Sequence, residues 1–446
     1  MNLPGLQAFS SNNWLECIGC GHRTNLLAER KFRCPSCGGL YDIVHDTTLA
    51  PPIGVLQNTF DERAKDSLRV HKLRPDLHSG VWRFKELVMP RLPDHYIVSL
   101  GEGNVPIVPA GKRLREWIGG NIELWLILEG MTPTGSFKDF GGTVMISVAK
   151  AAGISAIACS STGDTSAMAA AYSAAAGIRC AVILPKGLVT PVQLAQPLVH
   201  GATVINLPGN FDDCMRVMQD LVRDYGVYPA NSLNPSRIEG HQATVFLLGQ
   251  YFGWSLPSWI VAPVGNGSNC SSIGKALRSL KEAGMNHDTR ILGCQSEAAC
   301  PLSRSWITVQ RDGRVSLTDW KTAYQPLPVG NTSATAARIG DPVSRDKVMR
   351  EIVHSNGAMQ IASEQDLNEA VAICGKDGYF VCPQTGTALA GLRNAVGAGL
   401  IKEGLVAVVS TATGLKFTDS AATHLLPHVK GAADCRTETV AEIMQL

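Results

Sequence analysis

Thr134-Gly135-Ser136-Phe137-Lys138-Asp139 is the most informative stretch of this sequence, because it places a lysine between a strand and a helix. It follows an apolar run at 123–128 that is typical of a strand, and a helical pattern begins at Asp139. The positive end of the helix dipole and partial burial both favour the neutral form of a lysine amine here. Since only the neutral amine attacks an aldehyde, Lys138 is a candidate for Schiff-base chemistry. A lone lysine is more often a solvated surface charge, so the interpretation depends on the rest of the chain.

Strand and helix patterns alternate over most of the chain, which predicts βαβ units and mostly parallel sheets. The other short apolar runs typical of strands lie at 155–159, 180–184, 259–264, 290–294 and 405–409. Helical patterns lie between many of these runs, at 166–176, 212–225, 271–283, 364–375 and 386–398. Residues 50–100 differ, because five prolines there should interrupt any long element.

A glycine-rich loop follows the strand expected at 259–264 and precedes a predicted helix. Its sequence is Gly265-Asn266-Gly267-Ser268-Asn269. Small residues at a helix N-terminus let several backbone N–H groups converge on phosphate oxygens, so the loop is a candidate anion site. The same sequence is also compatible with a tight turn that holds no ligand.

Two further loops carry hydroxyl groups directly after predicted strands. One precedes an alanine-rich helix, where its side chains could hold a carboxylate or cap the helix. The candidates in that loop are Ser161, Thr162, Asp164 and Thr165. The other loop, 410–416, contains Thr411. Because α/β proteins bind ligands at the carboxyl ends of their strands, these loops together indicate one site.

Two C-x-x-C pairs near the N-terminus form a separate feature. They are Cys17-Ile18-Gly19-Cys20 and Cys34-Pro35-Ser36-Cys37. Four thiolates suit tetrahedral zinc, and the two residues inside each pair let one tight turn present both sulfurs. Unrelated buried or redox cysteines are the alternative. A zinc ribbon can also bind nucleic acid, but basic and aromatic residues are sparse here, so we expect a structural zinc.

The bulk composition excludes several classes of protein. The chain has 446 residues, enough for two or three domains, and a net charge of +2 that offers no field for nucleic acid or an anionic membrane. No apolar run reaches the roughly 18 residues needed to span a bilayer. Residues 1–14 lack a secretory signal pattern, so we expect a cytoplasmic protein whose 13 cysteines are reduced or bind metal.

These motifs resemble those of the fold-type II pyridoxal-phosphate enzymes and, within them, threonine synthases of the plant and cyanobacterial type. The lysine motif marks the superfamily, whereas segments 231–240 and 411–417 narrow the resemblance to threonine synthase. The resemblance extends over nearly the whole chain after residue 38. The other segments that carry it are Gly38-Gly39-Leu40-Tyr41-Asp42, Ser79-Gly80-Val81-Trp82, Glu102-Gly103-Asn104, residues 161–167 and Gly340-Asp341-Pro342-Val343-Ser344.

The resemblance implies a two-domain α/β fold similar to the tryptophan synthase β subunit, preceded by a small zinc ribbon. The ribbon would occupy residues 1–50, and the small domain would occupy 131–233. The large domain would combine 51–130 with 234–446. The family also implies a homodimer whose other partner is a small phosphorylated amino acid.

The resemblance also assigns roles to residues. Lys138 would bind pyridoxal 5'-phosphate covalently and then move protons, and Thr411 would contact the pyridine nitrogen. The glycine-rich loop at 265–269 would bind the cofactor phosphate. Asp164 would lie near the cofactor hydroxyl, with Ser161, Thr162 and Thr165 near the substrate carboxylate. The substrate phosphate would be held by Ser232, Asn234 and Arg237, since a guanidinium offers a bidentate fork.

The implied reaction converts O-phosphohomoserine and water into L-threonine and phosphate, by γ-elimination and β-addition of water. Family members usually carry a histidine where this chain has Thr413 and a methionine where it has Gly142, and we expect both positions to lie near the cofactor. One alternative is therefore replacement on another phosphorylated amino acid, as in a cysteate synthase that uses O-phosphoserine and sulfite. A β-eliminating dehydratase is a second. A binding protein on an inactive scaffold is a third, against which the intact Lys138 argues.

Overall fold

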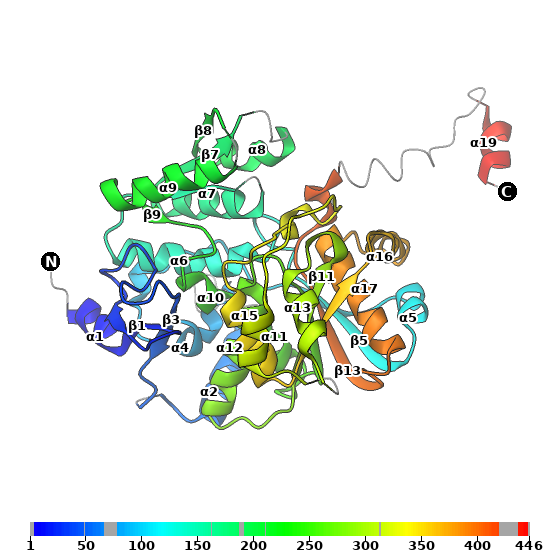
Figure 1. Ribbon diagram of the computed structural model, residues 1–446, viewed down its shortest axis with the longest axis horizontal. Helices are drawn as coiled ribbons and strands as arrows, with labels where there is room; N and C mark the ends of the chain where they lie inside the picture. The colour runs from blue at the N-terminus through cyan, green and yellow to red at the C-terminus, as the bar shows by residue number, and fades with distance from the viewer. Residues whose placement is uncertain are drawn as a thin grey trace.

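The structure is a computed structural model that describes residues 4–48, 50–66, 78–161, 163–186, 191–209, 211–311, 314–418 and 436–444. Its strands form three sheets with the orders β2-β1-β3, β12-β11-β10-β13-β5-β4 and β8-β7-β6-β9 (Figure 1). Within these residues, no helix has both the length and the apolar character that crossing a bilayer requires. The expected α/β architecture with two parallel-sheet regions and a small N-terminal unit is confirmed.

The six-stranded sheet is parallel except at its β4 edge, where β4 runs antiparallel to β5. Its central strand β10 is apolar and every residue of it is buried, because helices cover both faces of the sheet. Figure 1 shows α12 and α15 between this sheet and the N-terminal ribbon, with α17 on the other side. The strands are β4 (Ile107–Pro109), β5 (Asn121–Leu128), β10 (Trp259–Pro263), β11 (Arg290–Ser296), β12 (Ala358–Ala362) and β13 (Glu403–Ser410). The helices are α5 (Lys112–Ile118), α10 (Ser236–His241), α11 (Ala243–Tyr251), α12 (Ser268–Glu282), α13 (Pro301–Val309), α14 (Leu317–Ala323), α15 (Arg345–His354), α16 (Glu364–Lys376) and α17 (Pro383–Gly397).

The four-stranded sheet is parallel and forms a second layer with its own helices, at the top of the view in Figure 1. Its strands are β6 (Ala156–Cys159), β7 (Arg179–Pro185), β8 (Thr203–Leu207) and β9 (Tyr228–Pro229). Its helices are α6 (Lys138–Ala151), α7 (Asp164–Ala176), α8 (Pro191–Val199) and α9 (Phe211–Tyr225). Cys214 and Met218 of α9 pack on Ala158 and Ile183 of the sheet in a separate apolar cluster. The exact domain boundaries at residues 130 and 233 stay a prediction.

The N-terminal ribbon consists of α1 (Pro4–Asn12), β1 (Asn13–Cys17), β2 (Arg23–Asn25) and β3 (Tyr41–His45). Its strands are antiparallel, and Cys17 of β1 lies opposite Tyr41 of β3. The Phe32 ring meets the Tyr228 ring of β9 edge-on, with 5.4 Å between ring centroids. The ribbon is therefore packed on the body of the protein through an apolar contact.

The strands and helices expected from the sequence are confirmed, with shifted ends. The start of α12 shows one of the larger shifts, since it was expected at 271 and lies at Ser268. The expectation that prolines prevent any long element in residues 50–100 is wrong for α2 (Ile53–Asp66). Pro51 and Pro52 precede that helix, at its N-terminal end, where the missing N–H has no partner to lose. The remaining elements are α4 (Lys85–Val88), α19 (Thr437–Met444) and the 3-10 turns η1 (Trp82–Phe84), η2 (Asp94–Tyr96), η3 (Glu297–Ala299), η4 (Thr335–Ala337) and η5 (Gly414–Lys416).

Helices α6 and α10 approach each other backbone to backbone. A Cβ atom on Gly240 would overlap the carbonyl oxygen of Phe140. A Cβ atom on Gly141 would lie 2.6 Å from the His241 ring and 2.7 Å from the Arg237 carbonyl oxygen. Only glycine fits at these positions, so the two helices are held at a fixed short separation.

Gly240→Ala should destabilise the protein by about 1–3 kcal/mol or more, because the added methyl group must push α6 and α10 apart. Gly375→Ala is the matched control, since Gly375 lies near the end of α16 with open space at its Cβ position. That control should be neutral or should stabilise by roughly 0.5–1 kcal/mol. Urea unfolding of both variants checks this, and equal midpoints would contradict the close contact.

Candidate active site

Lys138 is the first residue of α6, at the end of the loop that leaves β5. Its Nζ atom lies 3.6 Å from the centroid of the Phe137 ring. Burial, followed by the nearby Arg237 guanidinium, lowers the pKa of Lys138 to about 7, although Asp164 acts in the opposite direction. A substantial fraction of this amine is therefore neutral at neutral pH, as covalent attack on an aldehyde requires.

Glu129 directly follows β5 and adds a carboxyl group beside Lys138. Burial raises the pKa of Glu129 to about 8, although the Thr244 hydroxyl donates a hydrogen bond to it. The carboxyl is thus mostly protonated at neutral pH and does not counter the positive charges around it. Glu129 was not among the residues expected from the sequence, where its one visible signal is its position immediately after a strand.

Asp164 and Lys416 connect the two sheet regions. Lys416 Nζ lies 2.9 Å from Asp164 Oδ1 at the start of α7, and it donates to the Thr134 carbonyl oxygen at 2.8 Å. One ammonium group therefore links the loop after β13, the lysine loop and the small-sheet helix. Lys416 lay inside the loop that the sequence marked as functional, but no role was assigned to it.

Thr411 directly follows β13 and adjoins the lysine motif. Its carbonyl oxygen accepts a hydrogen bond from the Phe137 N–H at 2.8 Å. Its hydroxyl oxygen lies 3.5 Å from Cys382 Sγ, and its N–H donates to the Thr385 hydroxyl at 3.3 Å. A hydroxyl, and not a carboxylate, therefore occupies this position, as the sequence suggested. Cys382 and Thr385 are partners that the sequence analysis did not identify.

The glycine-rich loop lies near Thr411 because β10 and β13 are neighbouring parallel strands. Gly267 has a φ of 89°, which allows the turn into α12. Asn266 is held by the Val343 N–H, which donates to its side-chain oxygen at 3.3 Å, and by the Ser344 N–H, which donates to its carbonyl oxygen at 3.0 Å.

Polar atoms near this loop have no protein partner. Both amide atoms of Asn269 and the Ser344 hydroxyl are buried and lack a hydrogen bond within the described part of the chain. Buried polar groups are nearly always satisfied, so such atoms beside a helix N-terminus fit a ligand with several acceptor oxygens. The loop at 265–269 is therefore suited to a phosphate group.

The loops after β6 and β9 of the small sheet are joined to each other. The Asn231 side chain accepts from the Ser160 N–H at 3.2 Å and donates to the Ser160 carbonyl oxygen at 2.9 Å. Ser161 accepts a bond from the Gly163 N–H at 3.4 Å, and Thr165 is buried in the first turn of α7. Thr162 lies outside the described residues.

Ser232 and Asn234 belong to the turn that precedes α10. Ser232 is partly exposed, and the structure gives it no distinctive contact. Asn234 donates to the Pro229 carbonyl oxygen at 3.0 Å and accepts from the Ser236 N–H at 3.1 Å. The Asn234 amide therefore stabilises the turn that precedes Arg237.

Arg237 is the most unusual charge in the site. Its side chain is fully buried, and only Nη1 has a partner in the described chain, the Ala230 carbonyl oxygen at 3.2 Å. Burial lowers the pKa of Arg237 to about 10, so it is still charged at neutral pH. A buried cation without a carboxylate partner is costly, which indicates that a bound anion completes this site.

His241 lies one turn after Arg237 and stacks near Phe137, with 4.9 Å between ring centroids. Burial, followed by the Arg237 and Lys138 charges, lowers the pKa of His241 well below its usual range. The imidazole is thus neutral. Neither ring nitrogen has a side-chain hydrogen-bond partner among the described residues.

The two departures from the family pattern have different surroundings. Thr413 donates its N–H to the Gly135 carbonyl oxygen at 3.1 Å and caps the turn that leads to Lys416. Gly142 faces α7, where an added Cβ would overlap the Met168 side chain, and its nearness to the cofactor stays a prediction. Met168 thus occupies the space that a side chain at position 142 would need.

The four cysteines of the ribbon converge as expected. Their sulfur atoms all lie within 4.8 Å of one another, with Cys17 and Cys37 3.4 Å apart and Cys20 and Cys34 3.5 Å apart. A tetrahedral zinc site with bonds of about 2.3 Å needs sulfurs about 3.8 Å apart, so the geometry fits. All four are free thiols. Cys17 pairs with Tyr41 of β3, so the cluster belongs to the N-terminal ribbon and not to the elements that carry Lys138.

Comparison with known proteins identifies the family. Residues 98–412 match the family described as pyridoxal-phosphate dependent enzyme. The chain is 36% identical to threonine synthase 2, chloroplastic, of Arabidopsis thaliana over 92% of this chain and 78% of the relative. It is 35% identical to the threonine synthase of Methanocaldococcus jannaschii over 91% of this chain and 93% of the relative.

The fold also matches a solved structure, the processed form of threonine deaminase isoform 2 from Solanum lycopersicum. The TM-score is 0.59, with 14% identity over 71% of this chain and 86% of the other. At that identity the likeness supports the fold alone. Since the sequence matches cover most of both chains, this chain belongs to the pyridoxal-phosphate-dependent enzymes and, within them, to the threonine synthase family.

Proposed function

We propose that this protein is a threonine synthase, which converts O-phosphohomoserine and water into L-threonine and phosphate. The observation that carries the proposal is Arg237, a buried guanidinium that is charged at neutral pH and whose Nε and Nη2 atoms lack partners in the described chain. The loop at 265–269 offers one phosphate site, and Arg237 offers a second one near Lys138. A phosphorylated substrate bound beside a phosphorylated cofactor needs both.

The residues present fit pyridoxal 5'-phosphate. Lys138 offers a buried amine with a lowered pKa, Thr411 offers a hydroxyl for the ring nitrogen, and Asn269 offers unpartnered amide atoms near the phosphate loop. When bound, the cofactor supplies an electron-accepting ring that makes the substrate Cα proton acidic. Asp164 is held by Lys416 and would lie near the cofactor hydroxyl.

The remaining chemistry belongs to the protein. The Lys138 amine would take the proton from the substrate Cα and then move a proton at Cβ, since its pKa of about 7 suits both roles. Arg237 would hold the phosphate as its bond to Cγ breaks, and the hydroxyls of Ser161 and Thr165 would orient the substrate carboxylate. A proton is then delivered to Cγ, which becomes a methyl group, water adds its hydroxyl at Cβ with loss of its other proton, and a proton returns to Cα. This sequence makes the protein a carbon–oxygen lyase of threonine biosynthesis.

The proposal includes a structural zinc on Cys17, Cys20, Cys34 and Cys37, supported by the convergence of their sulfurs. It also includes a homodimer, which rests on the family resemblance. A cytoplasmic location is consistent with the free thiol state of the described cysteines, since reducing compartments keep thiols reduced.

Lys138→Ala should abolish the visible absorbance of lysine-bound cofactor while the protein still folds.

Because burial lowers the pKa of Lys138 to about 7 from its ordinary value, the neutral amine becomes the major form above about pH 7 instead of above about pH 10. Cofactor attachment to the apoprotein should thus accelerate about tenfold per pH unit below pH ~7 and level off above it. Lys150→Ala, on the same helix, is the control. An attachment rate that keeps rising to pH 10 would contradict the assignment.

Arg237→Ala should reduce kcat/KM for O-phosphohomoserine by about tenfold to a hundredfold, as expected for a lost charge-assisted hydrogen bond. Cofactor absorbance should be unchanged, and Arg223→Ala on the exposed side of α9 should behave as the wild type. Phosphate release is the measurement. Loss of the cofactor with substrate affinity intact would mean that the two phosphate sites are exchanged. Turnover of O-phosphoserine with sulfite, but not of O-phosphohomoserine, would identify a cysteate synthase instead.

Elemental analysis of protein purified without chelator should find one zinc per chain. Cys20→Ser should lower the zinc content and the melting temperature, because a structural zinc contributes folding free energy directly. Cys300→Ser serves as the control, since Cys300 is buried far along the chain from the four candidate ligands. Zinc-free protein with an unchanged melting temperature would refute a structural zinc.

A further inference from the structure

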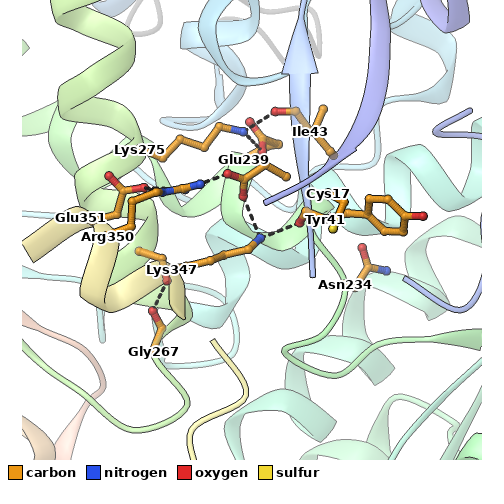
Figure 2. A network of polar contacts seen from close by, with 12 residues as sticks. Cys17, Tyr41, Ile43, Asn234, Glu239, Gly267, Lys275, Lys347, Arg350 and Glu351 are labelled. Atoms are coloured by element: carbon orange, nitrogen blue, oxygen red, sulfur yellow. Dashed lines mark hydrogen bonds and ion pairs between the residues drawn. The ribbon is translucent and has the colours of Figure 1, made fainter. Parts of the chain in front are cut away.

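Strand β3 of the ribbon enters a buried network of charges that also includes α10, α12 and α15 (Figure 2). Figure 2 shows Lys275 and Glu239 near Ile43 of this strand and Lys347 near Tyr41. Charged side chains are seldom fully buried unless they are paired. The ribbon is therefore joined to the body by specific polar contacts as well as by apolar packing.

Glu239 is the centre of one half of the network. It is fully buried in α10 and forms an ion pair with Lys275 of α12. His45 of β3 lies between two acceptor groups, with Nε2 3.2 Å from the same carboxylate and Nδ1 2.6 Å from Asn13 Oδ1. Lys275 also donates to the Ile43 carbonyl oxygen of β3 at 2.6 Å. Burial opposes ionisation of Glu239, but Lys275 and His45 outweigh it and lower the pKa of that carboxyl.

Asp42 is the centre of the other half. It accepts from Lys347 Nζ and Arg350 Nη2 of α15, each at 2.7 Å. Lys347 also donates to the Tyr41 carbonyl oxygen at 2.6 Å. Burial opposes ionisation of Asp42, but the two cations hold the pKa of that carboxyl well below its usual range. Every charge that β3 meets is thereby paired.

The same helix that receives His45 also carries Arg237. Helix α10 is short, Glu239 lies two residues after Arg237, and Gly240 holds the opposite side of the helix against α6. The glycine contact fixes the position of α10 along α6. The remaining freedom of α10 is its orientation, which depends on Glu239 and on the groups that hold this carboxylate. His45 is the one contributed directly by a side chain of the ribbon.

The zinc ligands lie at the other end of β3. Cys17 pairs directly with Tyr41 in the strand register, and Figure 2 shows the two side by side. A Cβ atom on Gly39 would lie 3.0 Å from Cys17 Sγ, so the sulfur cluster contacts the chain that leads into β3. A ribbon that loosens at its cysteines would therefore release His45 and Asp42 from the body.

We propose that His45 is a positioning residue of the second phosphate site, and that the zinc ribbon acts on this site through the contacts of β3. His45 holds Glu239, which sets the orientation of α10 and of the Arg237 guanidinium. The inference rests on the proposed function, because it takes Arg237 as the group that binds the substrate phosphate. It gives the ribbon a part in substrate binding although none of its residues touches substrate.

The test measures binding of inorganic phosphate to the holoenzyme, in which the cofactor phosphate already occupies the loop at 265–269. His45→Asn removes the donor to Glu239, whereas His45→Gln places an amide N–H close to the original Nε2 position. We expect His45→Asn to weaken phosphate binding and raise KM for substrate by about fivefold or more, with a smaller change in kcat. His45→Gln should stay within about twofold of the wild type. Arg23→Ala, which breaks an exposed ion pair of the ribbon with Glu16, should leave phosphate binding unchanged.

Zinc removal gives a second measure that does not depend on the folding of a variant. Chelation of the wild-type holoenzyme should weaken inorganic phosphate binding in the same direction while the cofactor absorbance is retained. Unchanged phosphate binding in both His45→Asn and the zinc-free enzyme would overturn the coupling. An equal loss in His45→Asn and His45→Gln would also overturn it, because the hydrogen bond to Glu239 would then not be the cause. Unchanged phosphate binding in Arg237→Ala would instead overturn the proposed function, which separates the two failures.

Discussion

The backbone contact between α6 and α10 is the constraint on which the site depends. Lys138 begins one helix and Arg237 lies on the other, and the glycines at their contact leave no room for a side chain between them. This closeness is what buries both cations and lowers the pKa of Lys138. Chemical reactivity at the amine is therefore a consequence of helix packing, since the same lysine on an exposed helix would be protonated at neutral pH.

The charges around Lys138 are unequal in number. Among the groups that act on Lys138, Arg237 and Lys416 are cations and Asp164 is a carboxylate that pairs with Lys416, while burial keeps Glu129 mostly protonated. Such an excess of positive charge attracts phosphate dianions and makes the site incomplete without them. The arrangement matches an enzyme in which both cofactor and substrate carry a phosphate group.

The local sequence predicted most helices and strands of the two parallel sheets. Strands that are buried on both faces are continuous apolar runs, and loops rich in small or polar residues follow them, so both are visible in the sequence. It also marked Lys138 and Thr411 as candidates, and the family resemblance marked Arg237, because each lies in a contiguous motif. It could not find the Asp164–Lys416 pair or the Glu239–His45 contact, since each joins segments far apart in the chain. The prolines of residues 50–100 gave a wrong prediction for 53–66. A proline count does not distinguish prolines that precede a helix, which are tolerated there, from prolines inside a helix, which break it.

The contact between Gly142 and Met168 has a consequence for how such sequences diverge. The family's usual methionine at position 142 and the methionine at 168 would compete for the same buried space between α6 and α7. A methionine introduced at position 142 alone would overfill the interior. Replacement of Met168 alone by a small residue would leave a cavity. In this chain a methionine at position 142 would therefore require a smaller residue at 168, and a chimera that receives only an α6 with methionine at 142 would place two side chains in one space although every residue in it is natural.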